Sequence, residues 1–284
     1  MYLSGMNCHY RYYDLEFCFK KLSKTGFQKM ELWTGPMHFY VDYRTNEDPG
    51  KLQLLSRKYG IDIIAVCPEQ TNPKPNNIAS ASRQDDIFNY YQRIIDIAEK
   101  CKSKKVTVTS GWAYRNENFE QAYERSVKMI RRIARYAAEK GINLVMEALQ
   151  PEESILVNSS KDLKKYIDRV GEHNLKVCID FGAMAKMGET IDDYFENCGS
   201  LIEHIHFVDG KPTGHLAYPT ATGILSLTCK HYSSMGIKAI YLVRAWQVFT
   251  MKNRGLQMRK IIRLFLRERR NWKKPGFHHL LSDK

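Results

Sequence analysis

Long apolar runs and paired cysteines are both missing from this chain of 284 residues. No run of about eighteen apolar residues occurs, and the N-terminal segment MYLSGMNCHY lacks a charged stretch followed by an apolar one. The sequence therefore predicts neither a membrane span nor a signal peptide, and we expect a cytoplasmic protein. Its seven cysteines are an odd number without a CxxC pair, which favours reduced core residues over disulfides or a zinc site.

Acidic residues are missing from one long stretch, 210–267, which contains no Asp or Glu. Residues 210–284 contain 15 Lys and Arg against 2 acidic residues, whereas residues 1–209 contain 29 of each kind. The net charge of +13 therefore lies in an atypical, basic C-terminal quarter. Basic segments can contact nucleic acid or an anionic surface. So abrupt a change in charge also needs a cause of its own.

The chain does contain a regular alternation of short apolar or β-branched segments with longer segments of helical period. The predicted strands are 2–6, 29–32, 61–66, 105–109, 142–147, 175–180, 202–208 and 239–243. The predicted helices are near 14–24, 49–59, 85–102, 118–140, 161–170, 191–197, 225–235 and 255–270. This pattern favours one closed α/β domain, a (β/α)8 TIM barrel over residues 1–270, followed by a basic tail over 271–284. A doubly wound open sheet is the alternative, but no Gly-rich phosphate-binding sequence follows the first strand.

Ionisable side chains end or follow several predicted strands. Segment 201–210 reads LIEHIHFVDG, in which His204 and His206 share one face because side chains alternate along a strand. The other strand-end residues are Glu31, Glu69, Glu147 and Asp180. In a barrel these ends meet at one face, so Glu147, Asp180 and His206 predict a divalent-metal site of oxygen ligands with one imidazole. The alternatives are a structural pair of histidines and carboxylates that cap the following helices.

Five segments together resemble the sugar phosphate isomerase/epimerase family, whose fold is the xylose isomerase-like TIM barrel. They are GFQKMELWTGPMHFY (26–40), CPEQTNPKPNNIA (67–79), INLVMEALQPEES (142–154), VCIDFGAMAKMGETIDDYF (177–195) and IEHIHFVDGKPTGHLA (202–217). The resemblance is to the branch of the ketose 3-epimerases and fructoselysine 3-epimerase. It implies an isomerase or epimerase that uses Mn2+, Co2+ or Mg2+ and moves a proton next to the carbonyl of a ketose or sugar phosphate through an enediolate.

The resemblance also implies roles for single residues. Glu147, Asp180 and His206 correspond to metal ligands, and Glu147 also to one of two glutamates that exchange the substrate proton. Glu153 corresponds to a partner of a substrate hydroxyl. Further candidates for substrate binding are Glu69, Asp209 and His215. Relatives are often dimers or tetramers, so a homo-oligomer is possible, whereas a nucleic-acid partner is not expected.

The chain departs from the family in the eighth predicted strand, which reads AIYLVRAW. Relatives have a fourth ligand, a glutamate, at or next to the position of Arg244. No acidic residue of 210–267 can replace it. Arg244 could instead pair with Glu147 and Asp180 in place of the cation.

A change of reading frame explains both the missing glutamate and the basic charge. Relatives continue after HLA with a turn such as WGDG, whereas residues 218–223 read YPTATG. If the third base of each codon is read with the first two of the next, this segment can spell Ser-Asp-Gly-Asp-Gly, and a glutamate codon can span Val243 and Arg244. We hypothesise that residues from about 218 onward are out of frame. The alternative is a true basic extension that contacts RNA, DNA or an acidic partner.

Three functions follow from these observations. The preferred one is the metal-dependent sugar isomerase or epimerase, with activity impaired by the loss of the eighth-strand glutamate. A sugar-binding barrel without turnover is the second, and Arg244 favours it. The third is a metal phosphodiesterase that resembles apurinic endonucleases, which would need more strand-end histidines than the sequence supplies.

Overall fold

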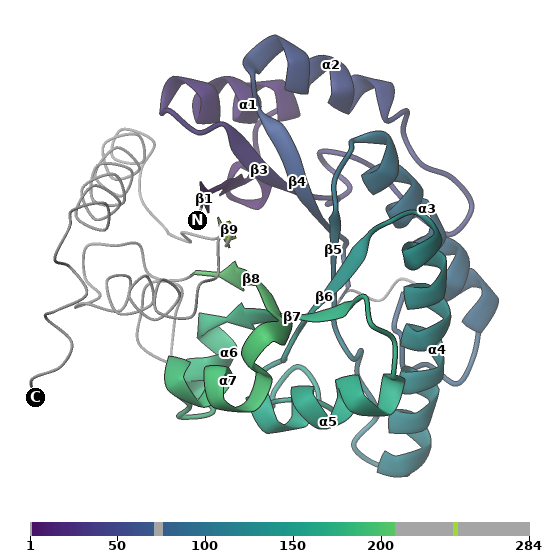
Figure 1. Cartoon of the computed structure of the whole chain (residues 1–284). Coiled ribbons are helices and arrows are strands. Elements are labelled where there is room, and N and C mark those ends of the chain that lie inside the picture. Colours follow the sequence, from purple (N-terminus) through teal and green to yellow (C-terminus); the bar gives the residue numbers. More distant parts are fainter. Residues whose placement is uncertain (1, 71–75, 208–240, 244–284) are drawn as a thin grey trace, which may run out of the picture.

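The computed structural model describes residues 2–70, 76–207 and 241–243, which form a parallel sheet surrounded by helices (Figure 1). The strand order is β1-β9-β8-β7-β6-β5-β4-β3-β2. Only Ser4 separates β1 (Tyr2–Leu3) from β2 (Gly5–Met6), and these two segments pair with β9 and β3 respectively. The sheet therefore closes on itself, and the prediction of a TIM barrel is confirmed over the open-sheet alternative.

The elements agree closely with the predicted alternation in the part of the chain that the structure describes. The remaining strands are β3 (Lys29–Trp33), β4 (Asp62–Cys67), β5 (Lys105–Val108), β6 (Asn143–Glu147), β7 (Leu175–Asp180), β8 (Ile202–His206) and β9 (Tyr241–Val243). The α-helices are α1 (Leu15–Lys24), α2 (Gly50–Tyr59), α3 (Gln84–Lys100), α4 (Phe119–Glu139), α5 (Ser160–Val170), α6 (Phe181–Lys186) and α7 (Ile191–Cys198). Two short 3-10 helices, η1 (Asn7–Tyr10) and η2 (Gly199–Leu201), precede α1 and β8. The predicted helices at 225–235 and 255–270 lie outside the described residues.

Side-chain caps fix where several helices begin. Ser159 and Asp162 form a reciprocal capping box at the start of α5, and Thr190 and Asp193 do the same for α7. Helix α6 was not predicted, because its six residues are too few to show a helical period. It begins directly after β7 because the last residue of that strand, Asp180, caps it.

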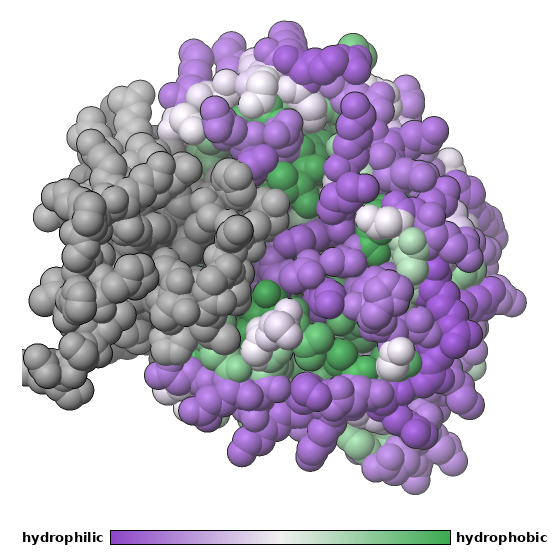
Figure 2. Space-filling model, viewed as in Figure 1, coloured by the Kyte–Doolittle hydropathy of each residue, from purple (hydrophilic) through white to green (hydrophobic). Residues whose placement is uncertain are grey.

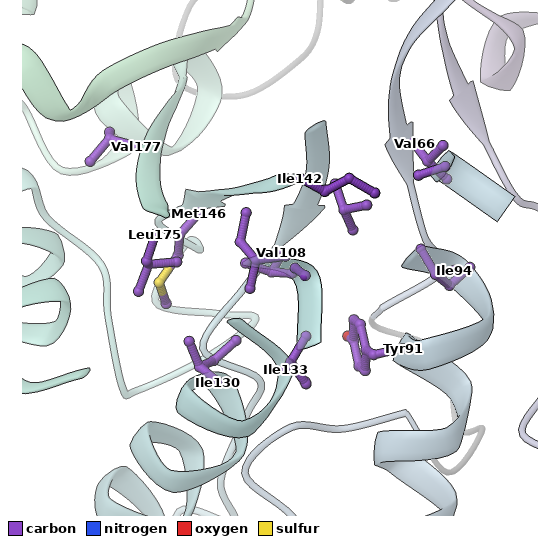
Figure 3. Close-up of a cluster of buried hydrophobic side chains, with 14 of the residues drawn as sticks. Val66, Tyr91, Ile94, Val108, Ile130, Ile133, Ile142, Met146, Leu175 and Val177 are labelled. Atoms are coloured by element: carbon purple, nitrogen blue, oxygen red, sulfur yellow. The ribbon is translucent and has the colours of Figure 1, made fainter. Parts of the chain in front are cut away.

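The apolar core lies between the barrel and the helices around it. Figure 3 shows Tyr91 and Ile94 of α3 and Ile130 and Ile133 of α4 among apolar strand residues, and all four are buried. The strand residues labelled there are Val66, Val108, Met146, Leu175 and Val177. Side chains alternate along each strand, so the positions between these residues face the barrel interior. Several of those interior positions are ionisable, and they supply the site.

The described surface is mostly polar. Hydrophilic residues cover most of the described part of the face in Figure 2. None of the helices in the described part of the chain has the length and apolar character needed to cross a membrane. Six cysteines lie in the described residues, and Cys18, Cys67, Cys178 and Cys198 among them are buried. The seventh, Cys229, lies outside the described residues, as do the predicted tail at 271–284 and nearly all of the segment from 218 that we hypothesise to be out of frame.

Candidate functional site

Three neighbouring strands of the barrel each end in an ionisable residue. Glu147, Asp180 and His206 are the last residues of β6, β7 and β8. These strands lie next to one another in the sheet, and the register pairs Asp180 directly with His206. Parallel strands carry their carboxyl ends to the same face, so the three side chains meet there.

The three side chains are close enough to share one ion. His206 Nδ1 lies 2.7 Å from Glu147 Oε2 and 3.8 Å from Asp180 Oδ2. One potential ligand atom from each residue lies within 4.8 Å of the other two, and all three residues are buried. Two carboxylates and an imidazole suit Mg2+, Mn2+ or Co2+, so the donor set fits the divalent metal predicted from the sequence.

Asp180 combines the two roles that the sequence left as alternatives. Its Oδ1 accepts hydrogen bonds from the backbone N–H groups of Gly182 at 2.8 Å and Ala183 at 3.0 Å, and these bonds cap α6. Its Oδ2 is the oxygen nearest His206. The capping alternative is therefore correct for one oxygen of this carboxylate, and the other oxygen faces the cluster.

A third carboxylate, that of Glu31, lies beneath this cluster, inside the barrel. Glu31 accepts hydrogen bonds from His206 Nε2 at 3.1 Å, from His204 Nε2 at 3.0 Å and from Thr107 Oγ1 at 2.8 Å. All four residues are fully buried. The prediction that His204 and His206 share a face is confirmed, since both reach Glu31. The sequence analysis placed Glu31 at a strand end, whereas it lies in the middle of β3. It lies two residues before Trp33 at the end of the strand, which is about 7 Å along the strand.

The buried charges shift one another's protonation. Burial alone would raise the pKa of Glu31, but the His206 and His204 rings hold it well below its usual range. Burial opposes a charge on His206 as well, yet Cys178 and the carboxylates on both sides of the ring hold its pKa well above the usual value. Burial lowers the pKa of His204 despite the nearby Glu31. The pKa shifts of Glu31 and His206 thus oppose the effect of burial on each group, and the shift of His204 follows it.

A pocket opens above the cluster and contains two further predicted residues. Glu69 and Glu153 line it together with Glu147, Asp180, Trp33 and Thr109. Glu153 Oε2 accepts a hydrogen bond from the backbone N–H of Gln150 at 3.0 Å. The other predicted site residues, Asp209, His215 and Arg244, lie outside the described residues.

The wall residue Trp33 is fixed by a network that the sequence did not reveal. The Asn7 side chain accepts from the Trp33 backbone N–H at 2.6 Å and donates to its carbonyl at 2.8 Å. Asn7 also donates to His38 Nδ1 at 2.9 Å. No pattern in the sequence relates residues 7, 33 and 38, which lie in η1, at the end of β3 and in the turn after it. The network anchors β3 where it reaches the pocket.

The geometry can now be compared with known proteins. A model of the family described as xylose isomerase-like TIM barrel matches residues 19–227. The chain belongs to this family. The match covers β3 to β8 and so includes Glu147, Asp180 and His206.

Two curated proteins that are similar in sequence to this chain are sugar epimerases. Fructoselysine 3-epimerase of Shigella flexneri is 23% identical over 227 residues, which are 79% of this chain and 82% of that protein. D-psicose 3-epimerase of Ruminiclostridium cellulolyticum is 24% identical over 201 residues, covering 68% of this chain and 66% of the relative. The solved D-psicose 3-epimerase of Clostridium cellulolyticum H10 superposes with a TM-score of 0.76 at 17% identity, over 93% of this chain and 98% of that one. The resemblance to the ketose 3-epimerase branch is confirmed.

Proposed function

We propose that this chain is a metal-dependent sugar isomerase or epimerase that moves a proton on the carbon next to a ketose carbonyl. The observation that carries the proposal is the meeting of Glu147, Asp180 and His206, of which Glu147 and Asp180 line a pocket. The names of the relatives support a sugar as the ligand. A divalent metal held by these three residues would polarise the carbonyl and stabilise the negative charge that develops on its oxygen.

The residues of the chain divide the remaining work between them. Glu147 lies at the floor of the pocket, and we propose that it removes the proton from the substrate carbon. Glu69 and Glu153 line the pocket, and we propose that they accept hydrogen bonds from sugar hydroxyls and so fix the substrate. Asp180 keeps one oxygen toward the cluster because its other oxygen is bound by the N-terminus of α6.

The experiment that tests this function follows deuterium. The purified full chain is incubated with a ketose and Mn2+ in D2O, and deuterium on the substrate carbon is measured by NMR or mass spectrometry. We expect metal-dependent exchange. A matched variant whose reading frame is restored after residue 217 regains the eighth-strand glutamate and should add net epimerisation to exchange. Sugar binding without any exchange in either protein would favour the non-catalytic barrel, and exchange that resists chelation of the metal would contradict metal dependence.

A further inference from the structure

Glu31 is a carboxylate enclosed in the barrel, and it has no part in the chemistry described so far. We propose that Glu31 is a positioning residue that holds the imidazole of His206 with Nδ1 toward Glu147 and Asp180. The consequence for metal affinity rests on the proposed function, whereas the orientation of the ring does not.

The contact between Glu31 and His206 crosses the interior of the barrel. Glu31 is on β3 and His206 is on β8, and these strands are not neighbours in the sheet. Both residues are fully buried. His206 Nε2 lies 3.1 Å and 3.2 Å from the two oxygens of Glu31. The interaction therefore ties the site end of β8 to the opposite wall.

The Glu31 carboxylate is itself held from three directions. Thr107 Oγ1 on β5 donates to Oε1 at 2.8 Å, and His204 Nε2 on β8 donates to Oε2 at 3.0 Å. Both oxygens thus have a second partner besides His206. A carboxylate with this many charge-assisted or neutral hydrogen bonds in a buried position has little freedom to rotate. Glu31 is a fixed acceptor for the His206 ring.

The Glu31 carboxylate at Nε2 determines the direction in which Nδ1 of the His206 ring points. The two nitrogens of an imidazole project from different edges of the ring, so a hydrogen bond at Nε2 leaves Nδ1 directed at Glu147, 2.7 Å away. A histidine that gives one nitrogen to a metal keeps its proton on the other, and a carboxylate partner stabilises that arrangement. Loss of such a partner lowers metal affinity by about 10- to 100-fold in comparable sites.

The glutamate also has a cost that a purely structural role would not justify. A buried carboxylate is expensive unless it is paired, and an apolar residue of similar volume is often as good for stability. Met30 and Leu32, on either side of Glu31, are fully buried apolar residues of the same strand. The ionisable side chain lies at the one position of this segment that faces His206.

The test uses Glu31→Gln in the full chain, with Glu31→Asp and Thr107→Val as matched variants. Glutamine keeps the size but cannot accept at both oxygens, aspartate keeps the charge with a shorter reach, and valine removes one donor without touching the His206 contact. Circular dichroism and urea unfolding check that each variant folds. Dissociation constants for Mn2+ are measured by calorimetry, without substrate. NMR of protein labelled with 15N-histidine, with His206→Asn for assignment, reports the His206 ring in the metal-free protein.

We expect Glu31→Gln to weaken Mn2+ binding by about 10- to 100-fold and to change the Nε2 signals of His206. Glu31→Asp should recover part of both, and Thr107→Val, which removes one support of the carboxylate but keeps its contact with His206, should change both less than Glu31→Gln does. Unchanged His206 signals and Mn2+ affinity in Glu31→Gln would overturn the proposal. If wild type binds no Mn2+ but the His206 signals still change, the proposed function fails and the positioning role stands. If Glu31→Gln does not fold, the comparison of Glu31→Asp with Thr107→Val decides, because only the former alters the His206 contact.

Discussion

Replacement of Glu147 by glutamine is expected to lower the rate of ketose exchange by about a thousandfold or more. Glutamine has the shape of glutamate, so the end of β6 and the pocket floor should keep their geometry. It cannot accept a proton from carbon, and it is a weaker ligand because it carries no negative charge. The measurement is the rate of deuterium entry into a ketose at saturating Mn2+, with Mn2+ affinity determined separately so that the two losses can be told apart.

Glu153→Gln is the matched control for that variant. Glu153 lines the same pocket, but it does not belong to the cluster of Glu147, Asp180 and His206. It should act mainly through substrate binding, so we expect its KM to rise while kcat falls by no more than about tenfold. Exchange that survives in Glu147→Gln and disappears in Glu153→Gln would assign the base to Glu153 instead.

Much of the fold could be predicted because a (β/α)8 barrel repeats one simple pattern. Buried parallel strands read as short apolar runs, and helices between them show a longer period, so both appear in the sequence. Helix α6 did not appear, because it owes its start to the Asp180 side chain rather than to a pattern. The interruption at Ser4 between β1 and β2 was also not predicted, because it depends on strand pairing and not on a sequence pattern. It arises where the N-terminal segment pairs with β9 on one side and with β3 on the other.

The sequence indicated the three residues of the candidate metal cluster, but it did not indicate the buried contacts of Glu31 beneath them. Glu147 and Asp180 each follow an apolar run, and His206 follows Ile205 in a predicted strand, so the sequence could locate all three near strand ends. Glu31 is separated in the chain from its partner Thr107 by 76 residues and from its partner His206 by 175 residues. They depend on how the strands are staggered around the barrel, which the sequence pattern does not specify. A glutamate between two apolar residues of a strand was the available signal.

Substitution of Asp180 is the second change for which we expect a large effect, here on Mn2+ affinity, because its two oxygens have different partners. Asp180→Asn retains an oxygen that can accept from Gly182 and Ala183, and asparagine is as good a helix cap as aspartate. It loses the negative charge that faces the cluster. We expect Mn2+ affinity to fall by more than about 100-fold, a larger loss than for a residue that only supports a ligand. The free energy of unfolding of the metal-free protein should change by no more than about 0.5 kcal/mol.

Comparison of Asp180→Ala with Asp180→Asn separates the capping role from the ligand role, because asparagine keeps the cap whereas alanine supplies neither. Metal affinity should fall as far as in Asp180→Asn, and the metal-free protein should lose a further 1 kcal/mol or so of stability, about the usual value of an N-terminal cap. Calorimetry with Mn2+ and urea unfolding without metal measure the two effects independently. Equal stability of the two variants would show that the bonds to Gly182 and Ala183 do not hold α6 in place. Unaltered Mn2+ affinity in both would remove Asp180 from the ligand set and leave it only as the cap of α6.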